Sequence, residues 1–327
     1  MQTASSTRQP IAGKIGALEI VPLDAALGAE VRGLDLRRLG DTEFAVLHRA
    51  FLDHLVLLVR DQPVTDDDLV AVARRFGELE MAPSGKERSS HQRFDGPPEI
   101  TVVSNVRVND VPIGELGDSE VIWHSDYSFK EIPAGMRLLH ALEIPPASAG
   151  GNTQFLNTYA AYDMLPAELK RMVHGRTIKH DTAYDTNRNL RLGAQPVTDV
   201  RLSPGPTHPI VTTHQESGHN SLFLGRKLFH YVNGLSVADS AALLDHLWAH
   251  AAQDRFIWEH EWRVGDVVIW DNRCTLHRRG PFAGDTRRVL HAAQVRGQRP
   301  AEAPDAQLRP PHPRSRLFGH AGGEVRK

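Results

Sequence analysis

A histidine and an aspartate one residue apart, together with a second histidine far downstream, are the side chains of this sequence best suited to metal chemistry. His124 and Asp126 form a His-x-Asp pair in the run Trp123-His124-Ser125-Asp126, and His277 lies in the last quarter of the chain. Two imidazoles and one carboxylate are the ligand set of non-haem Fe(II) oxygenases, and they leave half of an octahedral shell open. The sequence therefore predicts an iron site made by His124, Asp126 and His277.

The residues before His124 explain how the pair can share one ion. The apolar run 121–123 predicts a strand that leads into His124. On an extended chain, residues two apart project to the same face, so His124 and Asp126 point together while Ser125 points away. His277 follows a second predicted strand over 267–270 and a short turn, and the fold must bring it to the pair.

Two further residues match the needs of a dicarboxylate cosubstrate. Arg288 comes eleven residues after His277, and Thr153 follows the Gly150-Gly151 turn. Arginine binds a carboxylate through two parallel hydrogen bonds and stays charged, and a threonine hydroxyl can add a further hydrogen bond. Together with the triad, Thr153 and Arg288 predict a site for an iron-chelating dicarboxylate.

Other interpretations of these residues remain open at the level of sequence. The chain has 18 histidines, and a lone His-x-Asp pair is a weak motif. His246 and His250 have helical spacing, but no glutamate follows His246 as a zinc protease requires. A non-catalytic jelly-roll protein that binds a metal or a small molecule is one alternative. A zinc or manganese hydrolase with the same three ligands is another, and it leaves Thr153 and Arg288 unexplained.

The composition excludes several classes of protein. The chain has 327 residues, of which 40% are hydrophobic and 24% charged, with a formal net charge of −2. It lacks the basic excess of a nucleic-acid or membrane-surface binder, and no run of about 18 apolar residues predicts a membrane span. The N-terminus lacks the apolar stretch of a signal peptide. The single cysteine, Cys274, cannot form an intrachain disulfide. These features fit a cytoplasmic protein that acts on a small molecule.

The hydrophobic pattern predicts a mainly β core with helices around it. Apolar residues at helical spacing predict helices over 42–54, from Thr65 to Gly77 with Asp68 in a capping box, over 158–174 with a break at Pro166, and from Ser236 through Trp248. Strands and helices do not alternate regularly, which favours an α+β protein with a β-sandwich or jelly-roll core over a doubly wound sheet. The predicted strands cover 55–60, 100–104, 121–123, 153–156, 210–213, 222–224, 267–270 and 288–294, and long loops cover 83–98, 106–120 and 181–208.

The ends of the chain differ in composition from its body. Residues 1–12 are polar and without periodicity, and predict a flexible N-terminus. Residues 13–298 are expected to form a single domain. Residues 299–327 form a tail rich in proline and arginine, which can bury little apolar surface and is expected to be mobile or to lie along another surface.

Over most of residues 15–298, the chain resembles the taurine dioxygenase/2,4-dichlorophenoxyacetate dioxygenase family, whose members depend on Fe(II) and 2-oxoglutarate. Segments that agree in order and spacing carry the resemblance: GAEVRGLDL at 28–36, RRFGEL at 74–79, WHSD at 123–126, GGNT at 150–153, WDNR at 270–273 and the arginine pair at 287–288.

The resemblance implies a double-stranded β-helix, or jelly roll, with flanking helices. It implies that His124, Asp126 and His277 hold iron, and that the far carboxylate of 2-oxoglutarate lies on Arg288 and Thr153. The implied reaction uses O2 to hydroxylate a C–H bond of a small organic substrate, with an anion as one candidate class, and releases succinate and CO2. In this family the hydroxylated carbon often bears a heteroatom, so that the product cleaves there. A homodimer or homotetramer is compatible with the resemblance.

The sequence departs from the taurine-cleaving pattern in the substrate pocket. An arginine four residues after the cosubstrate arginine holds the sulfonate in that pattern, and this chain has Ala292 at that position. A pocket histidine of the pattern falls near Ala82. Taurine is therefore not the expected substrate. The basic residues left as candidates for binding an anion are His291, Arg279, Arg137, Lys86 and Arg88.

Overall fold

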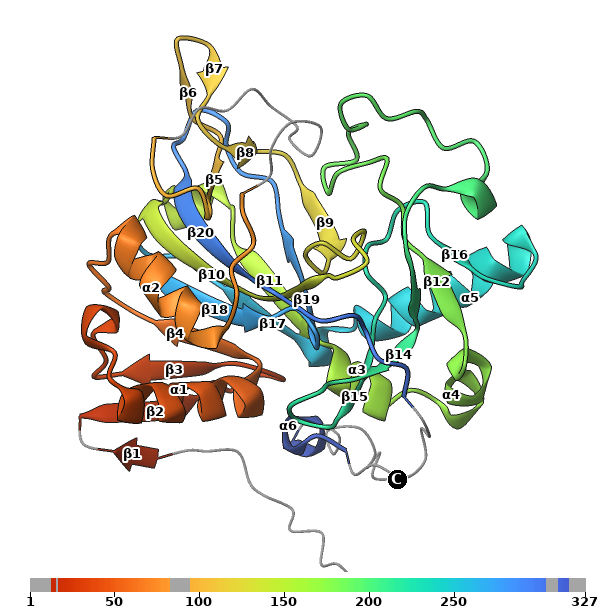
Figure 1. Cartoon of the computed structure of the whole chain (residues 1–327), viewed down its shortest axis with the longest axis horizontal. Helices are drawn as coiled ribbons and strands as arrows, with labels where there is room; N and C mark the ends of the chain where they lie inside the picture. The colour runs from red at the N-terminus through yellow and green to blue at the C-terminus, as the bar shows by residue number, and fades with distance from the viewer. Residues whose placement is uncertain (1–12, 16, 83–94, 304–310, 318–327) are drawn as a thin grey trace, which may run out of the picture.

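Two β-sheets lie at the centre of the molecule, and helices cover its outside (Figure 1). The computed structural model describes residues 13–15, 17–82, 95–303 and 311–317. Phe155 of the smaller sheet packs in one hydrophobic cluster with Val268, Trp270 and Leu290 of the larger sheet, so the two sheets enclose a common core. This arrangement is the predicted jelly roll with flanking helices.

The larger sheet joins strands from both ends of the sequence. It has nine strands, and its neighbours are antiparallel except for the β3–β4 and β5–β8 pairs. In spatial order its strands are β1 (Gly13–Ile15), β2 (Leu18–Pro22), β3 (Ala29–Arg32), β4 (Val56–Val59), β18 (Val267–Asp271), β10 (Ala134–Glu143), β20 (Val289–Arg296), β5 (Ile100–Ser104) and β8 (Glu115–Leu116).

The smaller sheet carries the histidines of the predicted metal site. Its order is β17 (Ile257–His260), β11 (Thr153–Asn157), β19 (Thr275–Arg279) and β9 (Val121–His124), and all pairs are antiparallel. The register pairs His277 of β19 directly with His124 of β9. Two positions more than 150 residues apart in sequence, as their numbers show, are thus neighbours across one strand pair.

Both faces of the large sheet are buried, which explains its apolar strands. On β20, Leu290 and Ala292 face the core between the sheets, whereas Ala293 and Val295 pack in the cluster under the N-terminal helices. Side chains alternate between the two faces of a strand, so each face of β20 contributes to a separate core. The predicted strand over 288–294 begins at Val289, which leaves Arg288 one residue before it.

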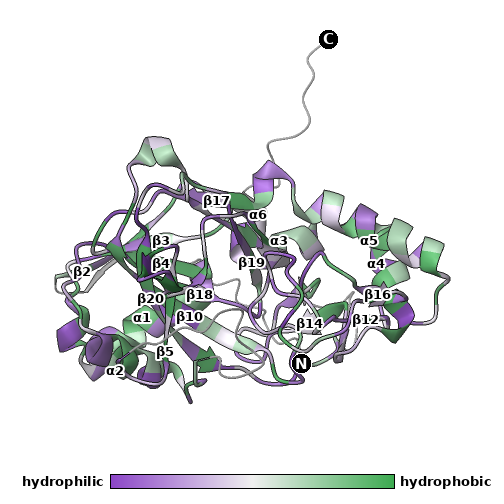
Figure 2. Cartoon of the chain, turned by 90° about the horizontal axis from the view of Figure 1, so that it is seen from above, coloured by the Kyte–Doolittle hydropathy of each residue, from purple (hydrophilic) through white to green (hydrophobic). Residues whose placement is uncertain are grey.

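The helices agree with the sequence predictions at their N-terminal caps. Thr65 and Asp68 form the predicted capping box, and Ser236 caps α5 by accepting a hydrogen bond from the backbone N–H of Asp239. Hydrophobic and hydrophilic residues alternate along α5, as a helix with one face on the core requires (Figure 2). No helix within the described residues is long and apolar enough to cross a membrane. The helices are α1 (Asp41–His54), α2 (Asp66–Phe76), α3 (Thr158–Asp163), α4 (Ala167–Val173), α5 (Val237–Ala251) and α6 (Pro313–Leu317), with 3-10 turns at Leu36–Arg38, Ala147–Ala149, Val200–Leu202 and Asp254–Phe256.

The remaining strands lie in small sheets, and one of them corrects a prediction. A strand was predicted over 222–224, but β15 ends at Leu222 because the chain then turns to run beside β9, where the Ser125 N–H donates to the Gly225 carbonyl. The small sheets combine β12 (Thr177–Lys179) with β13 (Thr207–Pro209) and β16 (Tyr231–Val232), β14 (Val211–Thr213) with β15 (Asn220–Leu222), and β6 (Arg107–Val108) with β7 (Val111–Pro112). The last pair and β8 lie in the segment 106–120, which was predicted as loop.

The described part of the C-terminal tail packs against the N-terminal region. Arg314 is 2% exposed and donates hydrogen bonds to the carbonyls of Leu23, Ala25 and Gly28 and to Nδ1 of His54. Its guanidinium therefore supplies donors to carbonyls of the loop between β2 and β3, of which that of Gly28 also accepts the Leu23 N–H. Residues 1–12, predicted to be flexible, lie outside the described residues.

Replacing Arg314 by methionine is expected to destabilise the protein. Methionine fills a similar volume but removes the donors to the part-buried carbonyls of Leu23 and Ala25 and to Nδ1 of His54, and each buried acceptor left unpaired costs about 1–3 kcal/mol. We expect the free energy of unfolding to fall by about 2–4 kcal/mol, measured by urea denaturation. Arg38→Met is the matched control, because its side chain is 85% exposed. Equal stability of the two variants would show that the Arg314 contacts contribute nothing.

Candidate active site

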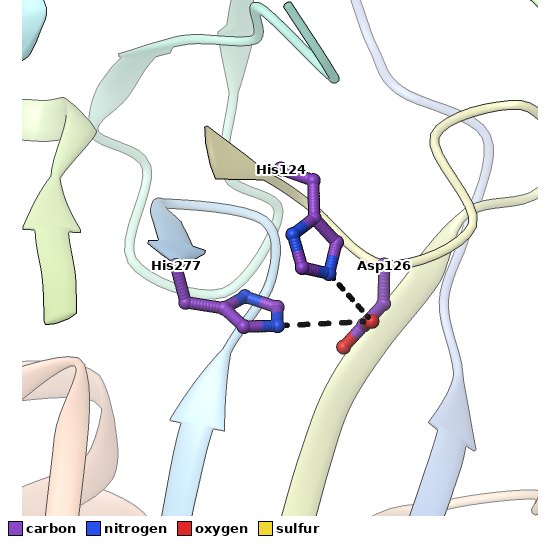
Figure 3. Close-up of side chains that lie close together, drawn as sticks. All are labelled: His124, Asp126 and His277. Atoms are coloured by element: carbon purple, nitrogen blue, oxygen red, sulfur yellow. Dashed lines mark ion pairs between the residues drawn. The ribbon is translucent and has the colours of Figure 1, made fainter. Parts of the chain in front are cut away.

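The three predicted metal ligands converge beside the paired strands β9 and β19 of the smaller sheet (Figure 3). His124 ends β9, His277 lies in the middle of β19, and Asp126 follows β9 by two residues. Oδ1 of Asp126 lies 3.6 Å from Nε2 of His124 and 3.8 Å from Nε2 of His277. All three side chains are buried, and one ligand atom from each lies within 4.8 Å of the others. This geometry fits a single ion bound by two imidazoles and one carboxylate.

The local hydrogen bonds prepare the triad for a cation. Nδ1 of His124 lies 2.8 Å from the carbonyl of Ile122, so this nitrogen carries the proton and Nε2 presents its lone pair. Burial, together with the neighbouring His124, holds the pKa of His277 well below its usual range, which keeps the imidazole neutral. Burial alone would raise the pKa of Asp126, but the Arg137 guanidinium, with smaller contributions from His277 and His124, outweighs burial, so the pKa is lowered and the carboxylate stays ionised. Its Oδ2 has no hydrogen-bond partner among the described residues.

Asn272 fixes the turn that presents Asp126. Its side-chain oxygen accepts the backbone N–H of Asp126 at 3.3 Å and the indole N–H of Trp270 at 3.0 Å. Its backbone carbonyl accepts the Ser125 hydroxyl at 2.8 Å, so Ser125 points away from the ion as predicted. The sequence pattern included the segment 270–273 but did not predict this role, because the role depends on a contact between distant strands.

Arg288 is a buried cation that pairs with no carboxylate in the part of the chain that the structure describes. The side chain is 2% exposed, and its Nε has no hydrogen-bond partner among the described residues. Burial, with a smaller contribution from Arg279, lowers the pKa of Arg288 to about 9, so it remains charged at neutral pH. A buried and unpaired charge is costly. Such a residue is suited to bind an anion that enters the cavity.

Thr153 lies at the same cavity and has its hydroxyl oriented by a neighbour. The indole N–H of Trp262 donates to Oγ1 of Thr153 at 2.9 Å. Because this bond uses an acceptor site of the hydroxyl, the Thr153 proton is left to donate to a further group. An incoming carboxylate is a suitable acceptor, as the sequence predicted.

Two adjoining cavities have His124 and Arg137 in common, and each contains one further member of the triad. The first contains the predicted cosubstrate residues Thr153 and Arg288 with His124 and His277, and its remaining walls are Val103, Leu116, Val121, Arg137, Leu139, Trp270 and Arg279. The second opens beside Asp126 and is lined by Thr101, Val103, Glu115, Leu116, His124, Ser125, Tyr127, Ser128, Phe129, Arg137, Asp185, Thr186, Arg191, Arg226 and Gln294. The first cavity thus holds a cation suited to a dicarboxylate beside His124 and His277, and the second gives another molecule access to His124 and Asp126.

The structure separates the basic residues that sequence left as anion-binding candidates. His291 faces away from the cavities and pairs with Asp66 of α2 at 2.6 Å. Arg279 lines the first cavity but donates to the backbone carbonyls of Leu116, Gly117 and Ser119. Arg137 lines both cavities. Lys86 and Arg88 lie outside the described residues. Ala292 is buried in the core between the sheets and carries no polar group into the cavity.

A second cluster of ligand-type residues, His214, Asp271 and Cys274, does not fit a metal. Nδ1 of His214 accepts the backbone N–H groups of Glu216 and Ser217, so its Nε2 carries the proton and donates to Asp271 at 3.0 Å. No imidazole lone pair is left for an ion. Burial raises the pKa of Cys274 well above its usual range, so the thiol stays protonated.

Comparison with known proteins decides the family. The family model described as "Taurine catabolism dioxygenase TauD, TfdA family" matches residues 19–294, which is most of the chain. The chain belongs to this family. The fold, the enzyme class and the family predicted from the sequence are therefore confirmed, and the protein is an Fe(II)- and 2-oxoglutarate-dependent dioxygenase.

Similar members of the family act on different substrates. The chain is 36% identical to an alpha-ketoglutarate-dependent 2,4-dichlorophenoxyacetate dioxygenase of Cupriavidus pinatubonensis, over 83% of this chain and 95% of that protein. It is 34% identical to an (S)-phenoxypropionate/alpha-ketoglutarate-dioxygenase of Sphingobium herbicidovorans, over 88% and 97%. The crystal structure of a taurine dioxygenase from Burkholderia xenovorans superposes with a TM-score of 0.70 at 28% identity, over 91% and 99% of the two chains.

Proposed function

We propose that this dioxygenase hydroxylates a small organic anion at a carbon next to a heteroatom. In the proposal, His124, Asp126 and His277 hold Fe(II), and Thr153 and Arg288 hold the far carboxylate of 2-oxoglutarate. The observation that carries this assignment is the buried Arg288 guanidinium, which lines one cavity with His124 and His277 and has no carboxylate partner within the described residues. Relatives with names such as phenoxypropionate dioxygenase and alkylsulfatase support an anionic substrate.

The residues of the chain contribute binding, orientation and exclusion of water. Bound iron with 2-oxoglutarate supplies the capacity to oxidise a C–H bond with O2. Arg288 and Thr153 fix the far end of the cosubstrate, so that its keto-acid end lies toward His124 and His277. Leu116, Leu139 and other apolar walls keep the first cavity poor in water, which strengthens the ionic contact with Arg288. The second cavity is left for the substrate.

Anaerobic addition of Fe(II) and 2-oxoglutarate tests the cofactor assignment. The wild-type protein is expected to develop a visible metal-to-ligand charge-transfer band, and the His124→Ala variant is expected to lose it. The matched control is His246→Ala, which removes an exposed histidine of α5 and should keep the band. A wild type without the band, or a band that survives His124→Ala, contradicts the assignment.

A screen for succinate release then tests the substrate class. Sulfonates, sulfate esters, aryloxy acids and amino-acid derivatives are compared with background turnover of 2-oxoglutarate. Stimulation by an anion supports the proposal. Stimulation by neutral compounds alone contradicts the anionic class. A metal-binding protein without turnover would give no succinate with any compound, and a zinc or manganese hydrolase would remain active without oxygen.

Three further expectations from the sequence stay predictions. These are a single domain over residues 13–298, a cytoplasmic location, and assembly as a homodimer or homotetramer. Size-exclusion chromatography with light scattering measures the last of them directly.

A further inference from the structure

We propose that Arg137 and Gln294 together bind the oxyanion of the substrate, and that this contact restricts reaction to carbons close to the charged group. The inference rests on the proposed function and adds the residues that bind the anion, which neither the sequence nor the relatives assign.

Arg137 is placed by the middle of the large sheet. It lies on β10, which runs between β18 and β20 (Figure 1). Its position is on the same face of the strand as Leu139 and Ala141, which pack in the core between the sheets. An apolar side chain at this position would continue the core. The chain has Arg137 there instead, and its side chain is only 12% exposed. A buried cation at such a position needs compensating partners.

The partners present satisfy only part of this guanidinium. Nη1 donates to Oδ1 of Asp126 at 3.0 Å, and this is the one hydrogen bond that Arg137 donates within the described part of the chain. Its Nε is buried and has no partner there. An arginine has five N–H groups in a fixed fork, so several donors remain for a ligand.

Gln294 supplies a second unpaired donor beside Arg137. The register of β10 and β20 pairs Arg137 directly with Gln294, and both side chains line the second cavity. Nε2 of Gln294 is buried and, like Nε of Arg137, has no hydrogen-bond partner among the described residues. Buried donors are almost always satisfied in folded proteins. Two such donors at directly paired positions, facing one cavity, match an oxyanion that accepts from both.

The other charged groups of this cavity, Glu115 included, have partners already. Arg226 donates to the carbonyls of Asp181 and Tyr184. Arg191 lies over the Phe129 ring at 4.3 Å and donates to the Tyr184 carbonyl. The carboxylate of Asp185 accepts the backbone N–H groups of residues 187 and 189. Arg137 is therefore the cation of the cavity whose donors are least used.

The contact with Asp126 sets how far the anion can lie from the metal ligands. An oxyanion on the Arg137 fork is separated from Oδ1 of Asp126 by the guanidinium and two hydrogen bonds of about 3 Å each. We infer that a carbon one or two positions from the charged group would then reach a metal held by His124, Asp126 and His277. The substrate class is a short carboxylate or sulfonate with an oxidisable C–H bond next to, or one carbon away from, the anion.

Binding of anionic probes and a neutral analogue tests this anion-binding site. Phenoxyacetate, benzylsulfonate, 4-phenoxybutyrate and the neutral phenoxyacetamide are titrated anaerobically into protein loaded with Fe(II) and 2-oxoglutarate. Binding is followed by the change in the charge-transfer band and by calorimetry. We expect the two short anions to bind wild type at least about 30-fold more tightly than the amide, because a charge-assisted pair is lost with the amide. In a separate assay with O2, 4-phenoxybutyrate is expected to release less succinate than phenoxyacetate.

Three substitutions at two positions locate the effect. Arg137→Met is expected to remove the preference for anions over the amide, while Gln294→Leu weakens anion binding by about 5-fold, as the loss of one neutral hydrogen bond does. Arg137→Lys should retain part of the preference, because it keeps the charge but not the fork. The control is Arg296→Met, whose exposed side chain pairs with Glu78 at the end of β20. Thermal melts confirm that each variant is folded.

The outcomes separate this inference from the proposed function. If wild type forms the band but Arg137→Met does not, Arg137 serves the metal site and the inference is overturned. An anion preference that survives Arg137→Met overturns it too, as does a wild type that binds neither short anion. A wild type without the band refutes the proposed function, and calorimetry with the probes alone still tests whether Arg137 binds anions.

Discussion

The Asp126→Ala variant is expected to lose its stabilisation by metal and to form succinate at least about 1,000-fold more slowly than wild type. Rate losses of this size are typical when one member of a catalytic unit is removed. Asp126 provides the only carboxylate of the triad, and its Oδ1 is the atom nearest to Nε2 of both histidines. Mn(II) at about 100 times its Kd stabilises a folded protein that binds it by roughly 2.7 kcal/mol. We therefore expect Mn(II) to raise the Tm of wild type and to leave that of Asp126→Ala unchanged.

The control for this prediction keeps the shape of the side chain. Asp126→Asn removes the charge but retains an oxygen, so it should bind Mn(II) weakly and show a small rise in Tm. Asp67→Ala, at an exposed position of α2, should behave as wild type. A full Mn(II) response in Asp126→Ala would mean that the ion binds elsewhere.

Arg288→Met is expected to make the protein more stable and nearly unable to bind 2-oxoglutarate. The buried guanidinium has no carboxylate partner within the described residues, so an apolar side chain of similar volume removes a cost of folding of about 1–3 kcal/mol. The same change removes the partner of the cosubstrate carboxylate, which costs about 30-fold to 5,000-fold in affinity. We expect a higher Tm without ligand, a large rise in the KM for 2-oxoglutarate, and a smaller change in kcat.

The neighbouring arginine provides the matched control. Arg287 is exposed and pairs with Glu143 at 2.6 Å, so Arg287→Met makes the same chemical change one residue away. It should raise neither the Tm nor the KM for 2-oxoglutarate. If the two variants raise the KM for 2-oxoglutarate equally, Arg288 does not hold the cosubstrate.

Local patterns were sufficient to predict the elements that carry the triad. The apolar run before His124 predicted a strand, and alternation then placed Asp126 beside His124 and turned Ser125 away. Helix caps such as Thr65 with Asp68 could also be predicted from the sequence, because capping depends on residues only three positions apart. The pairing of His277 with His124 was expected from the chemistry of the site, and the sheet register provides it.

The parts that sequence did not predict depend on contacts between distant strands. β10 was missed because the segment Ala134–Glu143 is buried on both faces and shows no alternation of polar and apolar residues. Without β10, the contact of Arg137 with Asp126 and its pairing with Gln294 could not be inferred. The orientation of the Thr153 hydroxyl likewise depends on Trp262, which is more than 100 positions away in sequence.

The order of strands in the large sheet has a consequence for how the chain reaches this structure. β4 lies next to β18, and β10 lies between β18 and β20, so strands made early have neighbours that are made late. While synthesis has not yet reached residues 267–296, β4 and β10 present apolar side chains and unpaired backbone edges. Such non-local pairing makes folding slow and exposes the nascent chain to aggregation. Expression of the protein should therefore respond strongly to lower temperature and to chaperones, even though the finished fold buries both faces of the sheet.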